Sequence, residues 1–221
     1  MDANVLAKPL TRTLLVIASA ASGYAVTWSG HVEDEANRHL RPAQKSVTEV
    51  RVAAGRELSE PGEHPERFAG TEAKDRQVLA DAVAADAAFL VTENVADFNQ
   101  ADLESTGVVA VNPDLFLSIK LTAEGYREAV EFVSRRSKNP HLTPAEFHIR
   151  LGRAHPLTVE THKSSFPDAT PLAATHNLPA VRYRGNRCLN CLQISEPVTE
   201  GLCARCAATV TASTKPSGTT A

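Results

Sequence analysis

Between residues 75 and 120 the sequence alternates between helix-type and strand-type patterns, and this alternation limits the fold more than any other feature. The segment DRQVLADAVAADAAFLVTENVADF (75–98) has apolar residues at helical spacing and then a continuous apolar run at 88–91. A second run follows at 107–111, with Asn112 and Pro113 as the cap and first residue of the next helix. Such short runs are typical of parallel strands that helices cover on both faces. We therefore predict a doubly wound α/β domain.

Weaker patterns extend this prediction along the chain. Val5 and Leu6 indicate that the chain begins in a buried strand, and residues 24–28 predict a second strand before a helix capped by Ser29. Further helices are predicted at 9–22, 43–60, 122–137 and 143–153, the last of them capped by Thr143.

Composition excludes several classes of protein. The chain has 221 residues, enough for one domain with a core and a small appended unit. Its apolar content of 43% and charged content of 22% are typical of a soluble globular protein, and no apolar run is long enough to span a bilayer. The formal charge of −3 creates no overall basic field, so binding of nucleic acid would require a local patch or bound metal.

The four cysteines form two pairs in the segment RCLNCLQISEPVTEGLCARC (187–206). Two Cys-x2-Cys pairs separated by eleven residues indicate a structural Zn²⁺ site with four thiolate ligands rather than a disulfide framework, and they favour a reduced, cytoplasmic chain. We predict a zinc ribbon whose folding depends on the metal. Its ligands are Cys188, Cys191, Cys203 and Cys206.

These patterns predict four regions: a domain at 1–158, a linker at 159–180, the zinc ribbon at 181–208 and a disordered tail at 209–221. Basic residues near the cysteines could form a modest RNA-binding patch, or the ribbon could bind protein, and the pattern does not decide between them. This patch consists of Arg182, Tyr183, Arg184, Arg187 and Arg205. His162 and His176 lack ligand spacing and are predicted to lie on the surface.

Acidic residues recur where predicted strands end or helices begin, and we expect several to meet at one edge of the sheet. Clustered carboxylates are the ligands that Mg²⁺ or Mn²⁺ prefers. Each acid also has a simpler explanation: Asp75 as a helix N-cap, residues 33–35 as a solvated helix face, and Asp97 in an Asx-turn. Asp81 could face solvent or turn inward.

In their order and spacing these segments resemble the PIN domain, most closely its bacterial toxin-like branch. The matching segments are DANVL (2–6), RTLL (12–15), WSGHVEDEANRHL (28–40), DRQVLADAVAADAAFLVTENVADF (75–98) and VNPDLFL (111–117). The resemblance covers about residues 1–155. It implies a three-layer α/β domain with a central parallel sheet, and a Mg²⁺- or Mn²⁺-dependent ribonuclease.

The resemblance also implies roles for individual residues. Carried over by position, the catalytic and Mg²⁺- or Mn²⁺-binding acids are Asp2, Glu35, Asp75 and Asp97, with support from Asn4, Thr92 and Asn94. Glu35 is preferred to Glu33 because it precedes a small residue, as in the family's pattern. The implied reaction is cleavage of RNA phosphodiesters by metal-activated water, and the implied partners are RNA, an antitoxin protein and a second copy of the chain.

Two positions depart from the family's pattern. Only Met1 precedes Asp2, where the family has several apolar residues that complete the first strand, and Asp81 stands where a small apolar residue is expected. We expect either a start a few codons upstream or a clipped first strand with a weakened site.

Three functions remain in view: a toxin-type metal-dependent endoribonuclease, a catalytically weak PIN domain that binds RNA or protein through its zinc ribbon, and a zinc-ribbon adaptor on a generic α/β scaffold.

Overall fold

The computed structural model describes residues 1–138, 140–169, 179–194 and 198–213 of the chain. The α-helices are α1 (Ala3–Leu6), α2 (Pro9–Ile17), α3 (Gly30–Arg38), α4 (Val47–Ala53), α5 (Arg76–Ala84), α6 (Gln100–Thr106), α7 (Pro113–Lys120), α8 (Ala123–Arg136), α9 (Pro144–Leu151), α10 (Pro156–Thr161) and α11 (Ala204–Ser213). The strands are β1 (Phe89–Val91), β2 (Val109–Val111), β3 (Tyr183–Arg184), β4 (Val198–Thr199) and β5 (Leu202–Cys203). Short 3₁₀ turns are η1 (Pro65–Arg67), η2 (Val95–Asp97) and η3 (Lys163–Ser165).

The predicted mixture of helices and parallel strands is confirmed in its coarse form. β1 and β2 pair in parallel, with Leu90 opposite Ala110. β3 joins the other edge of β2 in the antiparallel direction, so the order is β1-β2-β3. Among the described residues the parallel part of this sheet therefore consists of two short strands, which is less than the extended parallel sheet that we predicted. β4 and β5 form a separate antiparallel pair.

At the N-terminus the predicted first strand is wrong. Val5 and Leu6 lie in α1, and their N–H groups donate to the carbonyl oxygen of Asp2. Only Asp2 is extended, and its N–H donates to the carbonyl oxygen of Val91 at the end of β1 (3.0 Å). A run of two apolar residues fits a buried strand and a buried helical turn equally well, so periodicity could not separate them.

The second predicted strand is also absent: residues 24–28, all described, form no strand. Their backbone is bonded instead to several other parts of the chain, and Arg56 Nη1 donates to the carbonyl oxygen of Val26 (3.1 Å). The amino group of Met1 donates to the carbonyl oxygen of Thr27 (2.9 Å), and the N–H of Ser59 donates to that of Trp28 (3.0 Å). The segment therefore has partners but no continuous strand neighbour.

The helix caps that the sequence predicts are confirmed. Ser29 Oγ accepts from the N–H of Val32, and Asn112 Oδ1 accepts from the N–H of Asp114. Thr143 forms a reciprocal capping box with Glu146. The helices predicted at 122–137 and 143–153 match their bounds closely. α2 and α4 end earlier than predicted because turns follow them, and α4 also begins later, at Val47, because Ser46 caps it.

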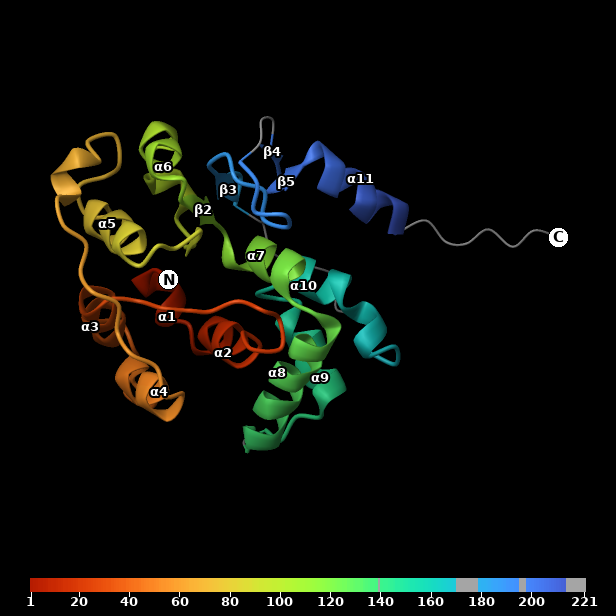
Figure 1. The fold of residues 1–221 in the computed structure, drawn as a ribbon. Helices are drawn as coiled ribbons and strands as arrows, with labels where there is room; N and C mark the ends of the chain where they lie inside the picture. The colour runs from red at the N-terminus through yellow and green to blue at the C-terminus, as the bar shows by residue number, and fades with distance from the viewer. Residues whose placement is uncertain (139, 170–178, 195–197, 214–221) are drawn as a thin grey trace.

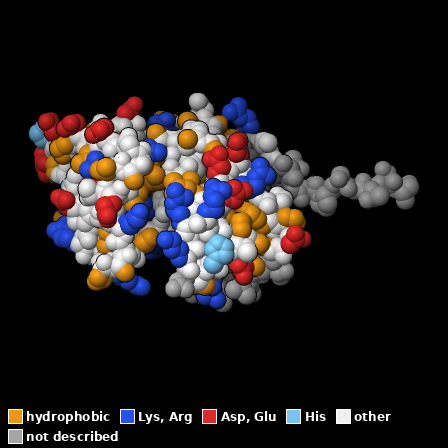
Figure 2. All heavy atoms as spheres, turned by 90° about the horizontal axis from the view of Figure 1, so that it is seen from below, with side chains coloured by type: hydrophobic (Ala, Val, Ile, Leu, Met, Phe, Trp, Pro, Cys, Tyr) orange, Lys and Arg blue, Asp and Glu red, His pale blue; other side chains and the backbone are white. Residues whose placement is uncertain are grey.

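Helices surround the short sheet and share one apolar core with it. α1 and α2 lie between the α3–α4 pair and the α8–α9 pair, and α10 packs on α7 (Figure 1). A groove between α2, α4 and α8 is lined by Val16, Val50 and Phe132, with Lys45 and Arg136 beside them. Figure 2 views the molecule from this side and shows Lys and Arg side chains interspersed with Asp and Glu, so this face has no single-sign field.

The C-terminal segment packs against the sheet instead of standing apart from it. β3 pairs with β2, and Leu189 from the cysteine region is fully buried in the main core. The predicted boundary at 158 falls inside α10, and α11 includes the first residues of the predicted disordered tail. Residues 170–178 of the predicted linker, including His176, and residues 214–221 lie outside the described residues. The described part of the chain contains no membrane-spanning helix.

Candidate acidic centre and cysteine metal site

Asp2 is buried at the carboxyl end of β1 and held by two of the predicted supporting residues. Its Oδ2 accepts hydrogen bonds from Thr92 Oγ1 (2.6 Å) and Asn4 Nδ2 (2.7 Å). Asn4 also donates to Thr92 Oγ1, and its own Oδ1 accepts from the N–H of Glu93. Asn94 contributes its backbone N–H to Thr92 Oγ1, while its side chain is exposed. The turn after β1 therefore fixes the orientation of the Asp2 carboxylate.

Asp75 and Asp97 lie together, and Glu72 joins them. One carboxylate oxygen from each of the three lies within 4.8 Å of the others, a spacing that could hold a metal ion. Asp75 stands at the N-cap position of α5 but makes no capping hydrogen bond, and no donor bonds its buried Oδ2. An N-cap role therefore does not account for Asp75, because capping requires a hydrogen bond from the side chain to the helix N–H groups.

Lys74 is the positive charge nearest to this group. Its Nζ lies 3.3 Å from Glu72 Oε2, 3.3 Å from Asp97 Oδ2 and 3.9 Å from Asp75 Oδ2. The ammonium group is well exposed, so its attraction for the carboxylates is screened by water. Lys74 therefore offsets only part of the repulsion among the three acids.

Charge effects link the predicted acids beyond this group. Burial is the largest cause that raises the pKa of Asp75 to about 6, and the nearby charges of Asp2, Asp97 and Glu72 raise it further against the opposing effect of Lys74. Burial likewise raises the pKa of Asp2, and Glu35 adds to this shift. Asp2 and Glu35 are not members of the 4.8 Å group, but the charge of Asp2 acts on Asp75 and the charge of Glu35 acts on Asp2.

Glu33 and Glu35 occupy different environments on α3. Glu33 is buried and accepts from Trp28 Nε1 (2.9 Å), Thr48 Oγ1 (2.7 Å) and Arg51 Nε (2.8 Å). Burial opposes the shift, but these hydrogen bonds lower the pKa of Glu33. Its lone pairs are thus occupied within the fold, whereas Glu35 is half-buried and faces Asp2 closely enough to affect it. The explanation of the whole acidic run as a solvated face is wrong for Glu33.

Asp81 turns inward and has a structural role. It accepts hydrogen bonds from Ser29 Oγ, from the N–H of Gly62 (2.8 Å) and from Gln77 Nε2 (2.8 Å). These contacts join α5 to the start of α3 and to the loop around Gly62. A Cβ at Gly62 would lie 2.0 Å from the carbonyl carbon of Ala80, so this loop approaches α5 too closely for any side chain. Asp81 is not part of the acidic group with Asp75.

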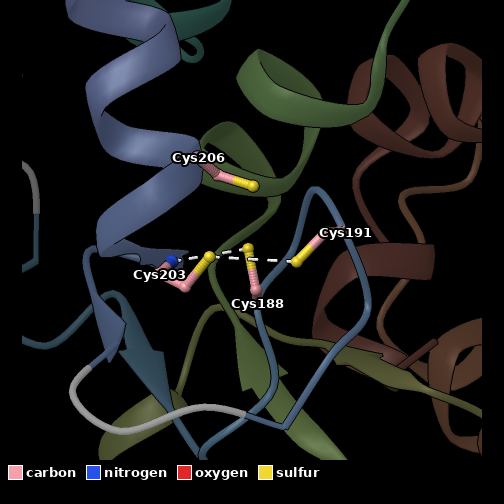
Figure 3. A group of neighbouring side chains, drawn as sticks. All are labelled: Cys188, Cys191, Cys203 and Cys206. Carbon is pink, nitrogen blue, oxygen red and sulfur yellow. Dashed lines mark hydrogen bonds between the residues drawn. The ribbon is translucent and has the colours of Figure 1, made fainter.

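The four cysteines converge as predicted. Their sulfur atoms lie within 4.8 Å of one another, and Figure 3 shows the side chains pointing toward a common centre. Cys188 and Cys191 come from one loop, Cys203 from β5 and Cys206 from the first turn of α11. The N–H of Cys203 donates to Cys188 Sγ (3.4 Å). Burial opposes deprotonation, but backbone N–H groups of Cys191, Cys203 and Asn190 lower the pKa of Cys188 to about 6.

This arrangement fits a tetrahedral metal. Zn–S bonds of about 2.3 Å place the sulfur atoms of a tetrahedron about 3.8 Å apart. Cys191 Sγ and Cys203 Sγ are separated by 3.8 Å. Four protein ligands leave no open coordination position, so a metal here would serve structure and not catalysis.

Three arginines of the predicted basic patch are already engaged within the protein. Arg182 forms an ion pair with Glu200, Arg184 donates to the carbonyl oxygens of Ala96 and Phe98, and Arg187 donates to those of Gly107 and Leu192. Arg184 and Arg187 thus join the ribbon to the domain, whereas the Arg182 ion pair lies within the ribbon, and these contacts leave all three less available to RNA phosphates.

Sequence reasoning missed two members of the acidic centre and misplaced one histidine. Glu72 and Lys74 lie between the predicted helices, outside every predicted element, and only their closeness to Asp75 in sequence could have drawn attention to them. His162 is buried and stacks on Tyr126 at a centroid distance of 4.5 Å, so its predicted surface position is wrong.

Comparison of the chain with models of protein families, with curated proteins and with solved structures finds no match.

Proposed function

We propose that this protein is a metal-dependent endoribonuclease of the PIN toxin type, with a three-layer PIN-like domain and a structural zinc ribbon. The observation that carries the proposal is the Asp75 carboxylate, whose buried Oδ2 has no hydrogen-bond donor although it lies among other carboxylates. Such a group is costly unless a cation joins it, and oxygen ligands favour Mg²⁺ or Mn²⁺.

Each predicted acid then has a separate task. Asp75 and Asp97 would hold the ion, with Glu72 as a further ligand, while Asp2 and Glu35 extend the negative surface toward β1. Thr92 and Asn4 keep the Asp2 carboxylate in one orientation. A divalent ion held there supplies Lewis-acid chemistry for hydrolysis of a phosphodiester. An antitoxin partner and a homodimer belong to this proposal as implications of the toxin type.

The second candidate is a catalytically weak PIN domain that acts as a binding module through its ribbon. The position of Lys74 favours this candidate, because its ammonium group already contacts Glu72 and Asp97 and so takes part of the space and charge of a metal ion. Since the ribbon arginines are engaged internally, such a module would bind protein in preference to RNA.

Cleavage of total RNA separates these candidates. We expect purified wild type to cleave in Mn²⁺, Asp75→Asn and Asp97→Asn to lose cleavage, and Asp34→Asn to retain it, because Asp34 is an exposed acid of α3 outside the centre. Equal cleavage by wild type and both variants would identify a contaminating nuclease and reject the enzyme. Absence of cleavage together with absence of Mn²⁺ binding would favour the binding module.

A further inference from the structure

The C-terminal part of the chain reaches back to the turn that carries Asp97. β3 lies along β2 although it comes from much later in the chain (Figure 1), with Arg184 opposite Ala110. From this position Arg184 Nη1 donates to the carbonyl oxygen of Ala96 (2.9 Å) and to that of Phe98 (2.6 Å). These two carbonyls belong to the residues directly before and after Asp97.

The turn η2 makes few hydrogen bonds of its own, and from outside it the N–H of Glu72 donates to the carbonyl oxygen of Asp97 (3.2 Å). It is a single 3₁₀ turn, in which the N–H of Asp97 bonds Asn94 (3.0 Å) and that of Phe98 bonds Val95 at a long 3.4 Å. Val95 and Phe98 are buried, whereas the Asp97 side chain points to a partly exposed position. Both hydrogen bonds come from one nitrogen, Nη1, so the end of this long side chain bridges both sides of the turn.

The ribbon in turn fixes the strand that carries Arg184. Tyr183 Oη donates to the carbonyl oxygen of Arg187 (2.6 Å), the residue before Cys188. Leu189, the residue after Cys188, is buried in the main core, and its N–H donates to the carbonyl oxygen of Gly201 (2.7 Å). The start of the first cysteine knuckle and β3 are therefore joined by one direct hydrogen bond and by the short chain segment between them.

We propose that Arg184 is a positioning residue for Asp97, and that metal in the four-cysteine site holds Arg184 in place. Loading of the ribbon then sets the affinity of the acidic centre for its divalent ion. This inference rests on the proposed function, because it takes Asp97 as a ligand of that ion. Loss of a residue that orients a metal ligand typically lowers metal affinity by about 10- to 100-fold.

Hydrogen exchange of the peptide covering residues 93–100 tests the positioning step without any activity. We expect faster exchange in zinc-loaded Arg184→Met than in wild type, and an intermediate rate in Arg184→Lys, which keeps the charge but ends in a shorter and more strongly hydrated ammonium group. Arg182→Met is the matched control, because Arg182 lies beside Arg184 but its side chain pairs with Glu200. Unchanged exchange in Arg184→Met, or equal acceleration in both Met variants, would overturn the inference.

Removal of zinc tests the second step. Wild type freed of zinc by dialysis against a chelator under reducing conditions should show the same faster exchange at 93–100, and readdition of Zn²⁺ should reverse it. Arg184→Met should add little to the effect of zinc removal, because both changes release the same contact. An effect of Arg184→Met that is equally large with and without zinc would exclude control by the ribbon.

Binding of Mn²⁺, followed by electron paramagnetic resonance, connects the turn to the acidic centre. We expect about 10- to 100-fold weaker Mn²⁺ binding in Arg184→Met and unchanged binding in Arg182→Met. If wild type binds Mn²⁺ and Arg184→Met binds it equally tightly, the inference is overturned and the proposed function stays intact. A wild type that binds no Mn²⁺ would instead reject the proposed function and the affinity step with it, and exchange alone would then decide whether Arg184 holds the turn.

Discussion

Replacement of Asp75 by Asn should stabilise the protein when Mg²⁺ and Mn²⁺ are absent and abolish the stabilisation that these ions give. The folded-state pKa of Asp75 is raised from 3.8 to about 6, mainly by burial. A carboxyl group with a raised pKa contributes stability below its unfolded pKa and loses it as the pH rises through the folded pKa. At pH 7.5 Asp75 is ionised in both states, so the folded protein bears the full cost of the shift.

The size of this cost follows from the shift. A difference of about two pKa units corresponds to about 3 kcal/mol. Because 14% of the Asp75 side chain remains exposed, solvent reduces this value, and we expect Asp75→Asn to gain about 2 kcal/mol at pH 7.5. For a chain of this length such a gain raises the melting temperature by about 4–8 °C. At pH 4 the gain should largely disappear, because most of the Asp75 carboxyl groups are then protonated in the folded protein.

Urea unfolding of zinc-loaded protein provides the measurement. Mg²⁺ and Mn²⁺ should be removed by dialysis and not by a strong chelator, which would also take zinc from the cysteines. At a concentration 100 times its Kd, Mn²⁺ should stabilise wild type by about 2.7 kcal/mol and should not stabilise Asp75→Asn, so the order of stability reverses. Asp34→Asn serves as the exposed control. The reasoning fails if Asp75→Asn is less stable than wild type without metal, or if Mn²⁺ stabilises both equally.

Three further predictions follow from other contacts. Lys74→Ala should bind Mn²⁺ more tightly than wild type, because it removes the cation that contacts Glu72 and Asp97. Isothermal titration calorimetry measures this affinity, and weaker binding by the variant would show that Lys74 positions the ligands instead of competing with the ion. Burial lowers the pKa of His162 to about 4, so stability should fall by about 2–3 kcal/mol as the pH drops from 7 to 4.5, and His162→Phe should remove this part of the dependence in urea titrations. Cys191→Ser should lose the single Zn²⁺ per chain measured by metal analysis, and retention of that zinc would reject the four-cysteine site.

Features that depend on neighbours in the sequence were predicted well. The caps at Ser29 and Thr143 require only a side chain and a backbone N–H three residues later. The cysteine cluster is similar, since each Cys-x2-Cys pair places two sulfur atoms in one knuckle. Long amphipathic helices such as α8 contain enough apolar residues to show the helical repeat without ambiguity.

Contacts between side chains of different helices and loops could not be predicted from the local sequence. Glu33 and Glu35 are two residues apart in one helix, yet only the packing of Trp28, Thr48 and Arg51 makes the first of them structural. His162 carries no local sign of burial, because its partner Tyr126 lies on another helix.

By itself, therefore, the sequence determined the strand–helix alternation of residues 75–120, the caps, the convergence of the four cysteines and the acids available for a site. The tertiary structure alone decided that α1 replaces a first strand, that Glu72 and Lys74 join Asp75 and Asp97, and that Arg184 of the ribbon holds the turn of Asp97. The physical reason is the separation in sequence of the residues that interact. Hydrogen bonds and periodicity within one element depend on residues a few positions apart. The partners of a buried charge or an edge strand depend on the packing of segments far apart in the chain.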